Sequence, residues 1–329
     1  MPQSRNVSIR LQKMLVGISV LLFIIKILAW LITDSVAILT DGLESTVNVV
    51  AGIVGLYSMI LAAKPRDREH PYGHGKVEFI SAAIEGTLIS VASLLIIYEA
   101  ILNLMNPHDL HQLDIGMILM ASTGVINYLM ALYIERKAEK EHSPILLSGA
   151  AHLKSDTYST IGLLLGVLLI RITGYAPLDS WTAILFAFLI LKTGYSILRK
   201  SISGIMDEHD ESLINDIVSV LNQHRKPEWL DIHNMRVINY AGFYHIDCHL
   251  TVAYYLNINQ AHEILDSLTA ILSAHFQERV EFFIHIDGCV PESQCGICRR
   301  ADCMARKEAF QEEIIWTADN ILSNQKHQF

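Results

Sequence analysis

Four polar side chains lie inside apolar stretches that are long enough to cross a membrane. Glu44 and Asn48 are one helical turn apart in "DGLESTVNVV", and His152 and Asp156 have the same spacing in "AAHLKSDTYST". Residues four apart in an α-helix project from one face. Two carboxylates, an amide and an imidazole offer a mixed oxygen and nitrogen ligand set, which suits Zn²⁺ and related divalent transition metals. The spacing therefore predicts a metal site shared by two membrane helices.

The two pairs are predicted to meet at one depth in the membrane. At about 1.5 Å per residue, Glu44 lies ~14 Å from the outer end of its span, and Asp156 lies ~16 Å from the inner end of its own. Both depths are close to half of a hydrocarbon core of ~30 Å. One alternative is a buried hydrogen-bonded cluster that joins the helices. Another is that Asp41 and Ser45, a pair with the same spacing on a neighbouring stripe, supply ligands.

The elements that must position these residues are apolar segments in the first 200 residues. The chain has 329 residues, of which 51% are hydrophobic and 18% are charged. A membrane helix needs ~20 mostly apolar residues, and the candidate spans are 12–33, 35–63, 76–104, 112–135, 145–173 and 178–198. The first run is too long for a cleavable signal peptide. Three further ionisable residues in these spans are interpreted as helix–helix or interface contacts: Lys26, Glu85 and Glu99.

The distribution of basic residues predicts the orientation. Lys and Arg gather at the N-terminus, in the second and fourth loops and at the exit from the sixth span, whereas the other loops hold almost none. The positive-inside rule then places both termini in the cytoplasm. We therefore expect an integral protein of the lipid bilayer, in a bacterial-type inner or cell membrane. The net charge of −9 without a basic patch argues against a nucleic-acid partner.

The second cytoplasmic loop, "KPRDREHPYGHGKVE", offers a second set of metal ligands. Asp67, His70 and His74 are spaced three and four apart, and the Pro and Gly residues favour a turn over a continuous helix. Two imidazoles and a carboxylate can form an open Zn²⁺ site. The alternative is a solvated loop whose histidines bind nothing.

All five cysteines lie in the tail: Cys248, Cys289, Cys295, Cys298 and Cys303. Disulfides are rare in the cytoplasm, so metal binding or free thiols are expected. The last four, which include one CxxC pair, are predicted to form a thiolate metal site, although their spacing matches no standard zinc finger. Unpaired or redox-active thiols are the alternative.

Three motifs together resemble a known family. "SVAILTDGLESTVN", "HPYGHGKVE" and "HLKSDTYS", in this order on six spans followed by a cytoplasmic tail, are similar to the cation diffusion facilitator family of divalent-metal/proton antiporters. The resemblance covers about residues 10–290. It implies a homodimer, metal bound at mid-membrane between the second and fifth helices, and export driven by inward-moving protons.

The resemblance also implies the roles of individual residues. The transport ligands fall at Glu44, Asn48, His152 and Asp156. A loop site falls at Asp67, His70 and His74, and an inter-subunit charge pair falls at Lys76 and Asp207. Family members usually have Asp or His at the position of Glu44 and Asp at that of Asn48. Carboxylate and carbonyl oxygen favour Mn²⁺ or Fe²⁺, whereas His152 favours Zn²⁺, Fe²⁺ or Co²⁺. The identity of the metal therefore stays open.

The tail is predicted to be a small α+β domain. Hydrophobic periodicity indicates helix, strand, strand, helix and strand over 211–223, 231–240, 243–254, 259–276 and 280–286. This αββαβ order is similar to the metallochaperone-like domain of the family. His245, Asp247 and His249 alternate onto one strand face. The resemblance implies a regulatory Zn²⁺ site among His233, His249, His262, His285 and Asp287. Histidines on a solvated sheet are the alternative.

The predicted organisation is a six-helix membrane domain over 1–205, a regulatory and dimerisation domain over 206–288, and a cysteine-containing tail over 289–329 with a terminal helix at 304–325. We expect an exporter that exchanges cytoplasmic Zn²⁺, or Fe²⁺, Co²⁺, Mn²⁺ or Cd²⁺, for protons. Zn²⁺ is the bound metal we expect most, with no organic cofactor. An enzyme is not expected, because the sequence has no nucleophile–base pair or nucleotide loop. The alternative is a membrane-anchored metal sensor that moves no ions.

Overall fold

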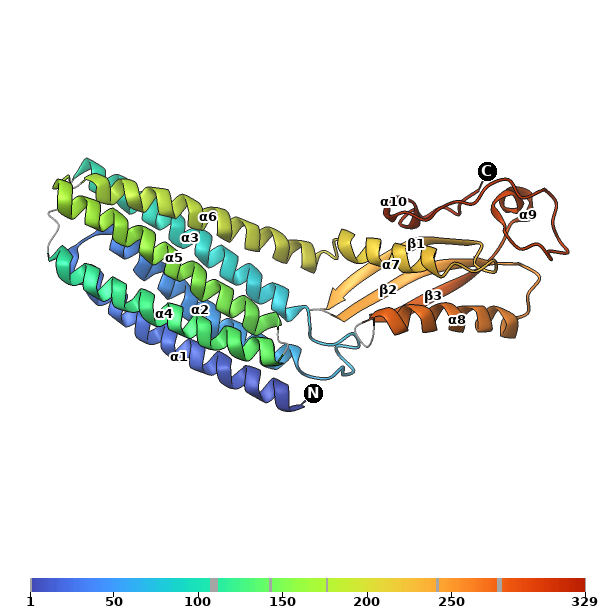
Figure 1. Cartoon of the computed structure of the whole chain (residues 1–329), viewed down its shortest axis with the longest axis horizontal. Coiled ribbons are helices and arrows are strands. Elements are labelled where there is room, and N and C mark those ends of the chain that lie inside the picture. The colour runs from blue at the N-terminus through green and yellow to red at the C-terminus, as the bar shows by residue number, and fades with distance from the viewer. Residues whose placement is uncertain are drawn as a thin grey trace. The chain divides into compact units, whose positions relative to one another are not determined.

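The structure is a computed structural model, and it describes residues 2–106, 112–141, 144–175, 177–240, 243–276 and 280–328. The chain divides into two compact units (Figure 1). One unit contains residues 1–65 and 77–202, and the other contains residues 66–76 and 203–329. The loop at 66–76 thus belongs to the same unit as the C-terminal domain.

The first unit is a bundle of long helices. Within the described residues these are α1 (Pro2–Thr33), α2 (Val36–Ala62), α3 (Val77–Met105), α4 (Leu113–Glu141), α5 (Pro144–Thr173) and α6 (Pro177–Ile205). Each has a segment long and apolar enough to cross a membrane, as the sequence predicts. Many large apolar side chains on the outer faces are exposed, among them Leu94, Leu165 and Phe188. Such a surface is stable in lipid, and the chain is an integral membrane protein.

Helix α2, which carries the first pair of polar residues, is held at its N-terminus by a residue of α6. Ser35 caps the helix by accepting a bond from the Ile38 amide. The Asp179 carboxylate accepts bonds from the Ser35 hydroxyl at 2.5 Å and the Val36 amide at 2.6 Å. A carboxylate at a helix N-terminus satisfies otherwise unpaired amides and favours the helix dipole. Along its length α2 packs against α1, α3 and α5.

Helices α3 and α6 approach closely at two glycines. A Cβ at Gly86 would lie 2.8 Å from the Leu198 amide nitrogen, and one at Gly194 would lie 2.8 Å from the Ile89 side chain. Small residues at such crossings let membrane helices pack backbone against backbone. Nearer the other end of the same pair, the Asn103 amide donates to the Ser180 hydroxyl at 2.9 Å.

The second unit contains the predicted αββαβ order. It comprises α7 (Glu211–Gln223), β1 (Asp231–Tyr240), β2 (Phe243–Val252), α8 (Ile258–Phe276) and β3 (Val280–Gly288). Strand β2 is central, antiparallel to β1 and parallel to β3 (Figure 1). A bulge in β1 lies between His233 and Arg236, where Asn234 has a φ of 52°.

One face of this sheet forms the core of the domain. Apolar residues of α7 and α8 pack with Ile232, Ile246 and Leu250 of the strands, and Cys248 points into the same core. Burial raises the pKa of the Cys248 thiol to about 12, so it stays neutral. Because side chains alternate along a strand, the neighbours Asp247 and His249 lie on the opposite face.

The predicted terminal helix at 304–325 is wrong. In this range the structure has a single helical turn, α10 (Ala318–Ile321), after the short elements α9 (Pro291–Gln294) and η2 (Cys295–Ile297). The apolar residues pack on the domain instead: Trp316, which is 1% exposed, joins its core. Side chains at the C-terminal end of α7 and just beyond it bind carbonyls that a helix would use: Asn222 of α7 donates to Trp316, and Arg225 after the helix donates to Ile314.

Candidate metal sites

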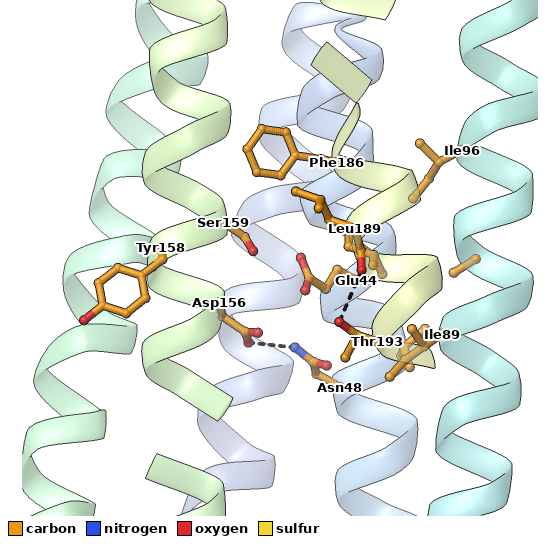
Figure 2. A pocket seen from close by; sticks show the side chains of 13 residues that line it. Glu44, Asn48, Ile89, Ile96, Asp156, Tyr158, Ser159, Phe186, Leu189 and Thr193 are labelled. Atoms are coloured by element: carbon orange, nitrogen blue, oxygen red, sulfur yellow. Dashed lines mark hydrogen bonds between the residues drawn. The ribbon is translucent and has the colours of Figure 1, made fainter. Parts of the chain in front are cut away.

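A cavity of about 340 Å³ lies inside the helix bundle, and its walls carry three of the four predicted transport ligands. Glu44 and Asn48 come from α2 and Asp156 from α5. Apolar side chains of α3 and α6, such as Ile96 and Leu189, complete the lining (Figure 2). A mostly apolar cavity with a few polar groups is typical of a specific binding pocket.

Helices α2 and α5 are joined at this cavity by a direct contact. The Asn48 amide nitrogen donates to the Asp156 carboxylate at 2.8 Å (Figure 2). Asp156 is 5% exposed. Among the described residues, Glu44 Oε2 is buried and has no hydrogen-bond partner. An unpartnered buried carboxylate oxygen is costly unless a cation or a proton binds it.

The fourth predicted ligand, His152, belongs to α5, but its side chain lies outside what the structure describes. Its neighbour Lys154 points away from the cavity, as expected from its position two residues along the helix. The Lys154 ammonium donates to both carboxylate oxygens of Glu135 on α4, at 2.7 and 2.9 Å.

The rival acid of α2 has a different partner. Asp41 is fully buried, and its Oδ1 accepts a bond from Lys26 of α1 at 2.7 Å and one from the Thr160 hydroxyl at 3.3 Å. Asp41 is therefore neutralised by a side chain of the protein itself. The predicted helix contact of Lys26 is thus an ion pair with Asp41, a partner that hydrophobic periodicity could not identify because it carries no information about pairing between helices.

The loop residues Asp67, His70 and His74 come together. One ligand atom from each lies within 4.8 Å of the others. Asp67 Oδ1 lies 3.2 Å from His70 Nδ1, and Asp67 Oδ2 lies 3.5 Å from His74 Nε2. The backbone amide of His70 donates to the Asp67 carboxylate, and this bond lowers the pKa of Asp67. An ionised carboxylate beside two imidazoles can bind a divalent cation.

This loop is fixed to the sheet of its own unit. Arg66 donates to both carboxylate oxygens of Glu281 on β3, and that pair lowers the pKa of Glu281. Tyr72 stacks on Tyr240 with ring centroids 5.6 Å apart. A Cβ at Gly75 would lie 2.5 Å from the Tyr240 carbonyl oxygen, so this position requires glycine.

The predicted charge pair also forms at this end of the unit. Lys76 donates to Asp207 at 2.8 Å, and each side chain is about one-third exposed. The pair connects the loop between α2 and α3 with the segment that follows α6, within one chain. Its role in the contact between subunits stays a prediction.

On the sheet, the structure gathers three of the five residues predicted there. His233, His249 and Asp287 each offer a ligand atom within 4.8 Å of the others. Asp287 Oδ2 lies 3.1 Å from His249 Nδ1 and 3.5 Å from His233 Nε2. His285 borders the group, with its Nε2 3.5 Å from Asp287 Oδ1. His262 lies elsewhere, on α8, with its Nε2 3.7 Å from Asp266.

Two residues of the tail, which the sequence analysis did not predict, contact this sheet site. Lys326 Nζ lies 3.5 Å from Asp287 Oδ2. His327 contacts the buried Asp231 carboxylate, and the other Asp231 oxygen lies 3.1 Å from His233 Nδ1. Burial acts to raise the pKa of Asp231, but hydrogen bonds with His233 and His327 outweigh it and lower the pKa to about 2. The ionised Asp231 orients His233 so that Nε2 faces Asp287, as carboxylates commonly do behind metal-binding histidines.

The four tail cysteines line one small pocket, together with Leu230 and Ala253 of the domain. All four are free thiols: Cys289, Cys295, Cys298 and Cys303.

The sequence matches two family models. The model described as "Cation efflux transmembrane domain" covers residues 13–206, and the one described as "Cation efflux protein, cytoplasmic domain" covers residues 209–289. Together they account for the helix bundle and for the α+β domain, and they stop before the cysteine-containing tail.

Curated transporters are similar to the chain. An uncharacterized transporter of Synechocystis is 39% identical over 56% of this chain and 59% of its own length. The manganese efflux system protein MneP of Bacillus subtilis is 28% identical over 80% of this chain and 90% of its own length. A cadmium, cobalt and zinc/H(+)-K(+) antiporter of Bacillus subtilis is 26% identical over 74% of this chain and 78% of its own length. The chain belongs to the cation efflux, or cation diffusion facilitator, family of membrane transporters, and it is a transporter rather than an enzyme.

Proposed function

We propose that the protein exports Zn²⁺ or a similar divalent transition-metal ion from the cytoplasm in exchange for protons. The observation that carries this proposal is the Asn48–Asp156 contact at 2.8 Å on the wall of a mid-bundle cavity. It supports a site that both helices share, because a relative movement of α2 and α5 would make or break the ligand set. Alternating access follows from such movement: the site opens to one side and then to the other.

Competition between metal and protons supplies the coupling. A metal ion binds deprotonated ligands, so its arrival displaces protons and protonation releases it. The unpartnered oxygen of Glu44 is available to either ion. Asn48 presents its amide nitrogen to Asp156, so its side chain must rotate for the amide oxygen to face a metal. His152 is proposed as the fourth ligand, and its reference pKa of ~6.5 suits proton exchange near neutral pH.

The donor set and the relatives support the same group of ions. Carboxylate and amide oxygens with one imidazole suit Mn²⁺, Fe²⁺, Co²⁺ and Zn²⁺. The relatives named above include a manganese efflux protein and an antiporter of cadmium, cobalt and zinc. We propose Zn²⁺ as the ion bound most tightly because His152 adds a nitrogen ligand.

The loop and sheet sites are proposed to sense cytoplasmic metal. Both belong to the unit that contains the α+β domain, and each gathers two imidazoles and a carboxylate. The family resemblance supports a homodimer in which this domain mediates contact and Lys76 and Asp207 join loop and tail. The excess of Lys and Arg in the even-numbered loops supports cytoplasmic termini.

Reconstitution in liposomes with a pH gradient tests the proposal. We expect uptake of Zn²⁺, Co²⁺, Mn²⁺ or Cd²⁺ by the wild-type protein and loss of uptake in Asp156→Ala. The matched control is Asp114→Asn, which removes an exposed carboxylate that pairs with Arg171 far from the cavity lining. Normal transport by Asp156→Ala contradicts the proposal. If no ion moves but the sheet site binds metal, the protein is a membrane-anchored sensor instead.

A further inference from the structure

The tail beyond residue 288 is held to the domain with very little regular structure. Between Cys289 and His327 the described elements are two helices of four residues and one 3-10 turn. Trp316 and Ile321 of this segment are nevertheless buried in the core of the domain. A segment with so few backbone hydrogen bonds of its own needs another constraint to remain in one conformation.

The four cysteines converge from three parts of this segment. Cys289 directly follows β3, and its amide donates to the Val252 carbonyl at 2.8 Å. Cys295 begins the 3-10 turn and Cys298 follows it, and the Cys298 amide donates to the Cys295 carbonyl at 3.3 Å. Cys303 comes from the following bend. All four nevertheless line the same pocket.

The surroundings of this pocket are those of a thiolate site. The backbone amide of Lys307 donates to the Cys295 sulfur at 3.4 Å, a contact that stabilises a thiolate. The Arg306 guanidinium donates to the carbonyls of Cys295, Cys298 and Arg300, and so holds the turn in shape. Cys295 and Cys298 are 7% and 5% exposed, which keeps solvent away from their sulfur atoms.

Four thiols around one small pocket, two of them buried, repel one another as thiolates and gain little as neutral groups. A soft divalent cation removes this conflict, because it binds four thiolates tetrahedrally and displaces their protons.

We propose that Cys289, Cys295, Cys298 and Cys303 bind one structural Zn²⁺, or an equivalent soft divalent ion, that fixes the C-terminal segment on the domain. Neither family model extends over the four together, and the site has no part in the transport cavity. The ion draws the four sulfur atoms inward from the pocket wall. The released protons go to solvent, and no oxidation state changes.

Metal analysis of the purified full-length protein in detergent tests the proposal. We expect one tightly held Zn²⁺ per chain that survives mild chelation and is lost in the double variant Cys295→Ser/Cys298→Ser. Replacement by Co²⁺ should give a sulfur-to-cobalt charge-transfer band of tetrahedral thiolate ligation, absent in the variant. The matched control is Cys248→Ser, which removes a buried thiol in the domain core and should leave the ion and the band in place.

Thiol labelling of the unaltered protein provides a test that does not depend on whether a variant folds. In the metal-loaded protein the four tail thiols should resist alkylation, and removal of the metal should make all four reactive. Rapid alkylation of all four in metal-loaded protein overturns the proposal. So does a disulfide among them found by mass spectrometry, or bound iron with sulfide. Transport is not measured in either experiment, so failure of the transport proposal leaves this one intact.

Discussion

Lys26 Nζ lies 2.7 Å from Asp41 Oδ1, and both side chains are shielded from solvent inside the helix bundle. Asp41, Asp156 and Lys26 are all electrostatic neighbours of Glu44. The formal charges of these three carboxylates and one ammonium sum to −2, which matches the charge of one divalent cation. Lys26 thereby reduces the formal negative charge beside the cavity by one.

Replacing Lys26 by Met should destabilise the bundle, because it leaves the Asp41 carboxylate buried without a counter-charge. Breaking a buried ion pair in this way costs about 3–5 kcal/mol. The double variant Lys26→Met/Asp41→Asn should recover most of the loss, as measured by thermal unfolding in detergent. Arg171→Met, which breaks an exposed pair with Asp114, is the control and should cost no more than ~1 kcal/mol. Equal thermal stability of Lys26→Met and the wild-type protein would contradict the pairing of Lys26 with Asp41.

Replacing Asn48 by Asp should strengthen metal binding in the cavity and slow metal release. The change removes the amide that donates to Asp156 and puts a second carboxylate beside it. Two close carboxylates bind a divalent ion more tightly and also compete more strongly for protons. In liposomes we expect a lower KM and a lower maximal rate for Zn²⁺, with a steeper dependence on pH. The control is Thr193→Val, a change at another residue that lines the same cavity. Unchanged kinetics would place the metal elsewhere.

Replacing Asp210 by Ala should weaken α7. Asp210 caps this helix, accepting bonds from the Ser212 hydroxyl and from the amides of Ser212 and Leu213. Loss of such a cap costs about 0.5–2 kcal/mol. The bond from the Ser212 hydroxyl is the main cause of the lowered pKa of Asp210. The contribution of the ionised Asp210 to the free energy of unfolding is therefore complete above the unfolded pKa of ~3.9. It is lost as the pH falls through the lower pKa of the folded state.

This loss of stability should be measured at a series of pH values by unfolding the protein and following the fluorescence of the buried Trp229 and Trp316. Asp210→Asn, which keeps a capping oxygen without the charge, should retain most of the stability and lose only the part of the pH dependence that Asp210 contributes. A wild-type profile that is flat from pH 5 to below the folded pKa would argue against the ionised cap.

Replacing Lys326 by Met should raise the affinity of the sheet site for Zn²⁺. The ammonium lies 3.5 Å from Asp287 Oδ2 and competes with a metal for that carboxylate. Because the pair is partly exposed, its contribution is ~1 kcal/mol or less, which corresponds to an increase of about two- to fivefold. Isothermal titration should measure it. Lys307→Met, which removes an exposed ammonium paired with Glu292, should not change the affinity.

The parts predicted from sequence are those that depend on periodicity. Helical spacing and depth placed Glu44, Asn48 and Asp156 on one cavity, and strand alternation separated Cys248 from His249. What could not be predicted depends on partners far apart in the sequence. The ammonium of Lys26 binds an acid on another helix, and the amide of Asn222 binds the Trp316 carbonyl that a terminal helix would have used. No local pattern encodes either choice.

The position of Lys326 and His327 on the sheet has a practical consequence for anyone who purifies this protein. Lys326 and His327 lie against Asp287 and Asp231, so a polyhistidine tag added after Phe329 would begin within a few residues of the sheet site. Its imidazoles would compete for the same ions and distort measured stoichiometries. An affinity tag attached at the N-terminus, or one removed by a protease before titration, avoids counting the tag as part of the transporter.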